Sequence, residues 1–511
     1  MPKKELRPDQ IADLAMLIHY KKFANLNDPA TGKTATSVAF SQYCWEYLGY
    51  KTVWTQPVGL MKKNRDEFYD FSDFSPDELV IVQGTPAERL ELMHSPNGKV
   101  FFFSADGWSR EYPLLLKAQP RVKVSIHDEL QLYYRGHTAQ RTQNWYDACR
   151  RMEAVVPMTG SLIRGKLSTA YPAIHVIDPT LYGSYEGFLA QHALVDENGK
   201  IYGWTNHAKL TKVLQAISMR RTFESIHGVE KPFIQVIKCE MGKLQRQKYM
   251  DFHEMGLIEL HDNFLEAKGG GVNWIRALQI MAHPEAVKLP IKWDKDGKPL
   301  AWKVYNLLGK HEKTGKDKVL EAYIQEHLDS GEPLVIYAAL IPEQIRIRDM
   351  IAKMGGKVGL INSTVVGAKR QQVDLDFKAG RIQFVVGSPA TCSTGFNWQD
   401  IDGWELTRII FVSMSPDDTD FTQAYKRGIR RLRTKKLEVI ILAYENSLDQ
   451  RIFQLIEIKS KEANLVDPTQ AQVYIHHTLV EGADVGNPKP KQQKKEKAGP
   501  PPGGKFTMST I

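Results

Sequence analysis

The sequence is poor in cysteine and has no long apolar run. Its 511 residues include four cysteines, Cys44, Cys149, Cys239 and Cys392, which lie far apart and form no CxxC pair. A disulfide scaffold and a structural zinc site are therefore not expected, whereas a reducing compartment is. No run of about 18 apolar residues occurs, and the N-terminal MPKKELRPDQ has no apolar core behind it. We therefore expect a cytoplasmic protein without a signal peptide or a membrane segment.

The metalloprotease motif is also absent, because Leu257 stands where a second histidine would have to follow His253-Glu254. Hydrophobic residues make up 42% and charged residues 25% of the chain, an ordinary globular composition, so most of the chain should fold. At roughly 100–200 residues per domain, the length predicts two to four domains. The formal net charge of +9 suits a polyanionic partner, although lysine-rich solvated surfaces give the same excess.

Short apolar runs of strand length alternate with amphipathic stretches in two parts of the chain. In residues 1–225 the runs are Lys51–Thr55, Leu79–Gln83, Val100–Ser104, Val122–Ile126 and Ala154–Met158. In residues 316–470 they are Leu334–Ala338, Lys357–Ile361, Ile382–Val386, Arg408–Val412 and Glu438–Leu442. This rhythm is typical of βαβ units around a parallel sheet, and it predicts two α/β lobes of similar design.

Residues 226–315 interrupt this rhythm, and we expect them to form a partly helical insertion. A flexible break is indicated at residues 267–271, a helix at Trp274–Ala282 and a turn at Asp294–Pro299. Residues 471–511 form a C-terminal extension, which should be disordered from about residue 486 because few apolar residues there can be buried. The lysines of this tail would either hold nucleic acid loosely or only keep the chain soluble.

A phosphate-binding loop is indicated by Gly32-Lys33-Thr34, at the end of the sequence NDPATGKT. In such a loop the backbone N–H groups at a helix N-terminus cradle phosphates. Lys33 would neutralise the β and γ oxygens of ATP, and the Thr34 hydroxyl would ligate Mg²⁺. The loop departs from the usual eight-residue pattern, since Asn27 stands where glycine is common. A GKT triplet alone often occurs by chance.

An acidic pair further along the chain supports the same interpretation. The predicted strand Arg121–Ile126 is followed by His127-Asp128-Glu129, and a doubly wound sheet presents its catalytic groups at the carboxyl ends of its strands. Asp128 would hold Mg²⁺ through water, and Glu129 would polarise the attacking water. An isolated Asp-Glu pair is more often a solvated surface pair. The interpretation therefore rests on the order of the two motifs, with the GKT triplet first and the acidic pair after a later strand.

Together these motifs resemble those of superfamily two helicases, and among them the Swi/Snf-type DNA translocases. The resemblance extends from Leu6 to about Ile452. The N-terminal LRPDQ resembles the LRPYQ element of the family, in which Arg7 and Gln10 would bind the nucleotide and Gln10 would read the adenine edge. MTGS at Met158–Ser161 resembles motif III, and MRRT at Met219–Thr222 resembles the MRRTK element that closes lobe one.

The second half of the chain shows the remaining motifs of the resemblance. LQIMAHP at residues 278–284 resembles LRQICNHP, and SPATCSTGFNW at residues 388–398 resembles motif V. QAYKRGIR at residues 423–430 matches motif VI, except that Lys426 replaces a glycine. By this resemblance Arg430 is the arginine finger and Arg427 senses the γ-phosphate. The residues that would couple the nucleotide site to lobe two are Gln131, Thr159, Gly160 and Gln423.

The resemblance implies two RecA-like, doubly wound parallel-sheet lobes and an ATP hydrolase that needs Mg²⁺ and moves along duplex DNA. Nucleic acid would be held by its phosphates, independently of base sequence, at loops near Gln56, Gly84, Ser388 and Asn397. DELQ replaces the DEAH of motif II, so Gln131 stands in place of the family histidine. A strand-separating DNA helicase, an RNA helicase and a nucleic-acid clamp on a degenerate ATPase fold stay open as alternatives.

Overall fold

The computed structural model describes residues 4–29, 31–228, 232–260, 264–266, 270–296, 298–308, 313–392, 396, 398, 405–415, 418–429 and 437–467. The tail expected to be disordered, residues 267–269 of the expected flexible break, Asn397 and Arg430 lie outside these residues. The chain divides into two compact units, one of Met1–Met241 with Lys313–Ala483 and one of Gly242–Glu312 with Asp484–Ile511. In the described part of the chain, no helix is both long enough and apolar enough to cross a membrane.

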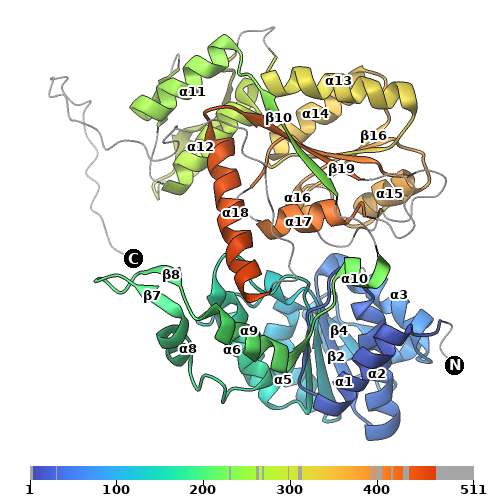
Figure 1. Cartoon of the computed structure of the whole chain (residues 1–511). Helices are drawn as coiled ribbons and strands as arrows, with labels where there is room; N and C mark the ends of the chain where they lie inside the picture. The colour runs from blue at the N-terminus through green and yellow to red at the C-terminus, as the bar shows by residue number, and fades with distance from the viewer. Residues whose placement is uncertain are drawn as a thin grey trace. The chain divides into compact units, whose positions relative to one another are not determined.

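Lobe one of the larger unit is built on a parallel sheet with the strand order β3-β4-β2-β5-β6. Figure 1 labels β2 and β4 of this sheet. Its strands are β2 (Lys51–Gln56), β3 (Leu79–Ile81), β4 (Val100–Ser104), β5 (Val122–His127) and β6 (Ala154–Pro157). Two short parallel strands, β1 (Ala24–Asn25) and β9 (Ser218–Met219), pair with each other, and Asn25 forms a bridge to Met158 beyond β6.

Helices cover both faces of this sheet. The helices of lobe one are α1 (Pro8–Tyr20), α2 (Lys33–Leu48), α3 (Met61–Phe71), α4 (Pro86–Met93), α5 (Ala105–Ala118), α6 (Gln140–Arg150), α7 (Tyr171–Ile177), α8 (Tyr185–His192), α9 (His207–Ile217) and α10 (Phe223–His227). Successive residues of β4 point to opposite faces. Phe101 and Phe103 join a core with α5 and α6, while Phe102 joins a core with α1, α2 and α3. Burial on both faces explains why the parallel strands are continuous apolar runs.

Lobe two has a six-stranded parallel sheet with the order β10-β19-β18-β15-β17-β16. Its strands are β10 (Phe233–Cys239), β15 (Leu334–Tyr337), β16 (Val358–Ile361), β17 (Phe384–Gly387), β18 (Arg408–Phe411) and β19 (Glu438–Tyr444). Its helices are α13 (Gly315–Ser330), α14 (Ile341–Lys353), α15 (Gly367–Lys378), α16 (Pro389–Cys392), α17 (Asp418–Lys426) and α18 (Leu448–Val466). The edge strand β10 lies within residues 226–315, which were predicted from the sequence to form an insertion.

In the part of the smaller unit that the structure describes, there are two α-helices and two antiparallel hairpins. Its elements are α11 (Lys243–Met255), β11 (Leu257–Glu259), β12 (Phe264–Glu266), α12 (Gly270–Ala282), β13 (Val287–Trp293) and β14 (Pro299–Tyr305). The expected helix is confirmed as part of α12. The expected turn is confirmed too, because the Asp294 carboxylate accepts hydrogen bonds from the backbone N–H groups of Asp296 at 2.9 Å and Lys298 at 2.7 Å. A third short hairpin, β7 (Ala193–Val195) with β8 (Ile201–Trp204), belongs to lobe one.

A buried carboxyl group lies at the carboxyl end of the lobe-two sheet. Glu343, in the first turn of α14, accepts a hydrogen bond from the Ser413 hydroxyl, whose oxygen in turn accepts from the Ala339 N–H at 2.8 Å. Burial raises the pKa of Glu343 to about 7, although the charge of Arg346 opposes the shift. The side chain is therefore about half protonated at neutral pH in the folded chain.

We expect this group to make stability depend on pH. The ordinary value for the carboxyl is 4.5, so the folded chain binds a proton that the unfolded chain releases, and stability falls as pH rises from 4.5 through about 7. Glu343→Gln removes the titration. Its melting temperature, minus that of the wild type, should therefore increase between pH 4.5 and pH 8. The exposed Glu91→Gln should show no such trend, and a constant difference for Glu343→Gln would contradict the assignment.

Candidate nucleotide-binding site

The predicted phosphate-binding loop connects β1 to α2. Helix α2 begins at Lys33, and Gly32 before it has a left-handed backbone with φ of 92°. A Cβ atom at Gly32 would collide with the Gln10 side chain, whose Nε2 donates to the Gly32 carbonyl at 3.3 Å. The left-handed backbone conformation therefore favours glycine at this position.

The Lys33 ammonium lies within the curve of the loop. Its Nζ donates to the backbone carbonyls of Asn27 at 2.8 Å and Asp28 at 3.1 Å. Burial lowers the pKa of Lys33, and the carboxylates of Glu129 and Asp128 oppose that shift. The structure thus brings together the lysine and the acidic pair that the sequence predicted separately.

The acidic pair follows the end of β5, at the edge of the sheet where the loop lies. The Asp128 N–H donates to the Thr55 carbonyl at 2.8 Å, and Glu129 has a left-handed backbone with φ of 51°. Such a conformation is strained in a residue that carries a Cβ atom, and it often occurs at functional sites. Burial and the adjacent Glu129 raise the pKa of Asp128 to about 6, while Lys33 opposes the shift. A like charge nearby disfavours the ionised form of a carboxyl group.

Gln131 contacts the acidic pair directly. Its side-chain N–H donates to the Glu129 carboxylate, and the residue is buried. Its Oε1 atom has no hydrogen-bond partner among the residues that the structure describes. Gln131 therefore orients Glu129 and retains an acceptor for a further donor.

Helix α3 contributes two side chains that the sequence reasoning missed. Asn64 donates from Nδ2 to the Asp128 carboxylate at 3.0 Å and also contacts the Gln56 amide oxygen. Glu67 forms a hydrogen bond with the Thr34 hydroxyl, which opposes the raised pKa that burial gives this carboxyl. Asn64 and Glu67 are three residues apart and thus share a helix face. That spacing was the only signal in the sequence.

Gln56 was expected to contact nucleic acid, but its side chain is buried. Its side chain is 0% exposed and belongs to the buried polar shell around Asp128. Gln56 is the last residue of β2, a strand in the middle of the sheet, and both faces of that strand are covered. The loop that follows is accessible, because Val58 is exposed.

The LRPDQ element and motif III contact the loop from two other directions. Arg7 Nη2 donates to the Thr31 carbonyl at 2.6 Å and pairs with Asp9 at 2.9 Å. Thr159 is fully buried and its hydroxyl accepts from the Ser161 N–H at 2.9 Å. Gly160 approaches Pro29 so closely that a Cβ atom would lie 2.7 Å from the proline ring. Four of the predicted site residues, Arg7, Gln10, Thr159 and Gly160, thus lie beside the loop.

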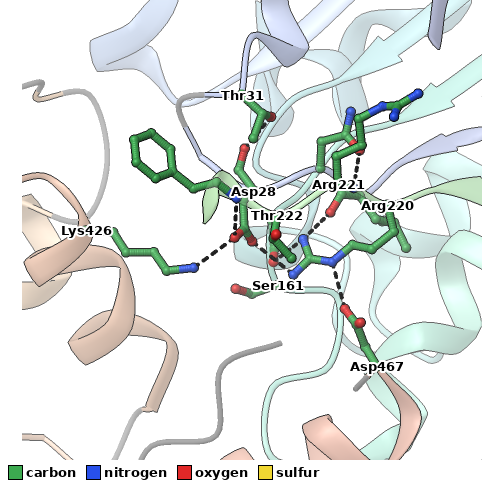
Figure 2. A network of polar contacts seen from close by, with 12 residues as sticks. Asp28, Thr31, Ser161, Arg220, Arg221, Thr222, Lys426 and Asp467 are labelled. Carbon is green, nitrogen blue, oxygen red and sulfur yellow. Dashed lines mark hydrogen bonds and ion pairs between the residues drawn. The ribbon is translucent and has the colours of Figure 1, made fainter. Parts of the chain in front are cut away.

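Asp28 of the loop forms the centre of an ionic network that spans the two lobes (Figure 2). Its carboxylate pairs with Arg220 at 2.9 Å and with Lys426 of α17 at 3.1 Å, and Arg220 also pairs with Asp467 at 2.8 Å. The Phe223 N–H donates to it at 3.2 Å. Burial would raise the pKa of Asp28, but the charges of Lys426 and Arg220 prevail and lower it. The carboxylate is therefore ionised and neutralised by one cation from each lobe.

Helix α18 strengthens this connection between the lobes. Ala463 and Val466 near its end join the core of lobe one. His207 of α9 pairs with Glu462 at 2.9 Å, and the Thr211 hydroxyl donates to the Val466 carbonyl at 2.6 Å. The end of α18 thereby positions Asp467 beside Arg220.

Motif VI of lobe two faces the acidic pair of lobe one. Burial lowers the pKa of Arg427, and the charges of Glu129 and Asp128 oppose that shift, so the guanidinium lies near both carboxylates. Gln423 is buried in α17, and its Nε2 has no hydrogen-bond partner within the described residues. Arg430, the expected arginine finger, lies outside those residues.

The two remaining loops proposed to contact nucleic acid follow β3 and β17. Gly84 is exposed with φ of 106°, and its carbonyl accepts from Arg89. Ser388 is partly exposed, and its carbonyl accepts from the N–H groups of Thr391 at 3.1 Å and Cys392 at 2.9 Å. Each loop lies at the carboxyl edge of its own sheet.

Comparisons with known proteins identify the fold. No family model matches the chain. The helicase domain of Hef from Pyrococcus furiosus is similar in structure, with a TM-score of 0.50 and 13% identity over 88% of this chain and 97% of that chain. The SWI2/SNF2 ATPase core of Sulfolobus solfataricus, in complex with dsDNA, matches with a TM-score of 0.39 and 18% identity over 91% of this chain and 95% of that chain. The second likeness is too weak to support an argument.

The expected fold is therefore confirmed as two RecA-like α/β lobes. At 13% identity the likeness shows the fold alone. The roles expected for the site residues therefore rest on the sequence motifs and on the contacts described above.

Glu129→Gln should retain ATP binding while hydrolysis falls on the order of 10²–10⁴-fold, because an amide keeps the shape of the side chain but cannot accept a proton. Nucleotide affinity and turnover should be measured on the same preparation. Glu153→Gln, an exposed residue before β6, is the matched control and should leave both unchanged. If Glu129→Gln loses ATP binding as severely as turnover, Glu129 is a structural residue.

The pair between Asp28 and Lys426 should show energetic coupling in a double-mutant cycle. Either Asp28→Asn or Lys426→Met leaves one buried charge without its partner, so the double variant should lose less in melting temperature than the two single losses combined. Asp28→Asn combined with Lys461→Met, which changes an exposed residue of α18, should instead be additive. Additivity for Asp28 and Lys426 would mean that the pair does not stabilise the folded chain.

Proposed function

We propose that this protein is a motor that hydrolyses ATP and moves along duplex DNA. The observation that carries this proposal is the convergence of Lys33, Asp128 and Glu129 of lobe one with Arg427 of lobe two. Two cations and two carboxylates from both lobes match what phosphoryl transfer from ATP requires, which is charge neutralisation and an oriented water. A clamp on a degenerate ATPase fold would have no need of this set.

Each residue of the site has a distinct role in this proposal. Lys33 and the loop N–H groups bind the β- and γ-phosphates, and Gln10 and Arg7 bind the base. Thr34, and Asp128 through water, would hold Mg²⁺, whose charge would neutralise the phosphate oxygens. Asn64 fixes the Asp128 carboxylate and Gln131 fixes Glu129, which polarises the attacking water. Arg427 and, by motif VI, Arg430 stabilise the charge that develops on the γ-phosphate.

The ionic network around Asp28 supports a coupling between nucleotide and lobe movement. Lys33 and Asp28 belong to one loop, and the Lys33 ammonium donates to the Asp28 carbonyl. Phosphates bound to Lys33 compete with those carbonyl contacts, so they act on the same loop that Lys426 of lobe two holds by its charge. ATP binding and hydrolysis thereby change how the lobes are joined, as in other enzymes in which closure completes the site.

The choice of duplex DNA rests on the Swi/Snf-type motif set and on the energetics of tracking. A motor that follows phosphates needs only one backbone, which is accessible in an intact duplex. Opening the helix costs about 1.4 kcal/mol per base-pair step in lost stacking, so translocation without opening is the less costly process. Contacts to phosphates carry no base information, so binding should be independent of sequence and sensitive to salt.

The test is ATPase activity measured with duplex DNA, single-stranded DNA and RNA side by side, paired with displacement of a triplex-forming strand. Duplex DNA should stimulate hydrolysis most, and the third strand should be displaced. Lys33→Ala should abolish both, because it removes a charge-assisted phosphate contact worth roughly 1.5–3 kcal/mol. Stimulation by RNA alone, or fork unwinding without triplex displacement, would contradict movement along duplex DNA.

A further inference from the structure

The hairpin of β13 and β14 in the smaller unit is buried at its base and exposed at its tip. Val287, Leu289 and Tyr305 are buried where the strands leave and rejoin the unit. Towards the turn, the consecutive residues Ile291–Trp293 are all exposed. Because successive residues of a strand point to opposite faces, this half of the hairpin is open on both sides.

The exposed part of the hairpin is unusually apolar. One face of β14 presents Leu300, Trp302 and Val304, which are 59%, 48% and 58% exposed. Trp293, next to the turn, is 50% exposed. All other tryptophans that the structure describes are buried or half-buried. A contiguous apolar surface of this kind marks a site of interaction.

The same hairpin carries a positive charge. Lysines 288, 292, 295, 298 and 303 outnumber the aspartates at 294 and 296. The strand register places Lys288 opposite Val304 and Pro290 opposite Trp302, so Lys288 and Trp302 share a face. The Lys288 ammonium lies 5.4 Å from the centre of the Trp302 ring. An aromatic ring and a cation therefore form a single surface element.

We propose that this hairpin binds the unpaired bases of a single-stranded polynucleotide. Proteins that bind single strands without sequence preference combine aromatic rings, on which bases stack, with cations that follow the phosphates. Trp302 supplies the stacking surface, Lys288 supplies the charge, and Trp293 supplies a second ring near the turn. A base in an intact duplex is already stacked on its neighbours, so this surface selects unpaired strands.

The charge of the hairpin also argues against a second copy of the chain as the occupant. In a symmetric dimer the same surface meets itself, and two surfaces rich in lysine repel each other. A polyanion satisfies the lysines and the exposed rings together.

This inference goes beyond the proposed motor and does not depend on ATP hydrolysis. It concerns a contact with unpaired bases, whereas the motor requires only phosphates. Binding is therefore measured on the full chain without nucleotide, so that either proposal can fail while the other stands.

The experiment measures the affinity for a 20-residue oligothymidylate and a 20-residue oligouridylate by fluorescence anisotropy. Trp302→Ala should weaken binding of the single strand by roughly 5- to 150-fold, the range expected for one stacked base. Trp302→Phe should restore most of the affinity. Tyr202→Ala, which removes a 69% exposed ring from the β7–β8 hairpin, is the matched control and should have no effect. The two oligomers distinguish DNA from RNA as the source of the strand.

Two further measurements test the proposal independently of whether Trp302→Ala folds: the salt dependence of binding in a lysine variant and photo-crosslinking of the wild-type chain. Lys288→Gln should reduce the slope of log affinity against log salt by about 0.7, whereas Lys200→Gln, at the turn of the β7–β8 hairpin, should not. Photo-crosslinking of bromouridine-substituted oligomers to the wild-type chain should label the peptide that contains Trp302. Unchanged affinity in Trp302→Ala together with labelling elsewhere would overturn the proposal. So would an effect of Trp302→Ala on self-association alone. Loss of duplex-stimulated ATPase in the wild type would instead overturn the motor.

Discussion

The predicted phosphate-binding loop contains one buried charge, the carboxylate of Asp28, and the rest of the site depends on the cations that neutralise it. An uncompensated carboxylate in this position would be costly, because burial disfavours the ionised form. Arg220 and Lys426 approach it from different lobes, and Arg220 is held in turn by Asp467 at the end of α18. The fold of the loop and the arrangement of the lobes are therefore linked by electrostatics. In the proposed motor, phosphates bound at the loop would influence lobe two through this carboxylate.

The groups proposed to be catalytic also lie among opposite charges. Burial and Glu129 raise the pKa of Asp128, and Lys33 opposes that shift. The charges of Glu129 and Asp128 in turn oppose the lowering of the Arg427 pKa by burial. The motif VI glycine of the resembling family is replaced here by Lys426, which adds a cation to the network. In the sequence, Lys426 was only a departure from motif VI. In the structure it pairs with Asp28, a residue of the predicted phosphate-binding loop.

The parts predicted from the sequence are those governed by local pattern. Parallel strands buried on both faces are continuous apolar runs, and for that reason β4 and β5 were found and the edge strand β10 was not. Phe233 on β10 is 54% exposed, and the smaller unit separates β10 from the rest of its sheet in the chain. Asn64 and Glu67 were missed because their roles arise only when α3 lies beside the loop. Gln56 was expected outside, yet its position at the end of a central strand turns it inward.

The turn of the β13–β14 hairpin was predictable because Asp294 closes it by local hydrogen bonds. The exposure of its tryptophans was not predictable, because the sequence of an apolar strand does not show whether the strand lies in a core or on a surface.

The exposure of these rings bears on function. A motor that tracks phosphates gains nothing from exposed aromatic rings, because paired bases offer no free faces to stack on. Exposed tryptophans beside lysine can stack on bases only where strands are unpaired. The proposed motor and the proposed hairpin surface would therefore recognise different states of the nucleic acid.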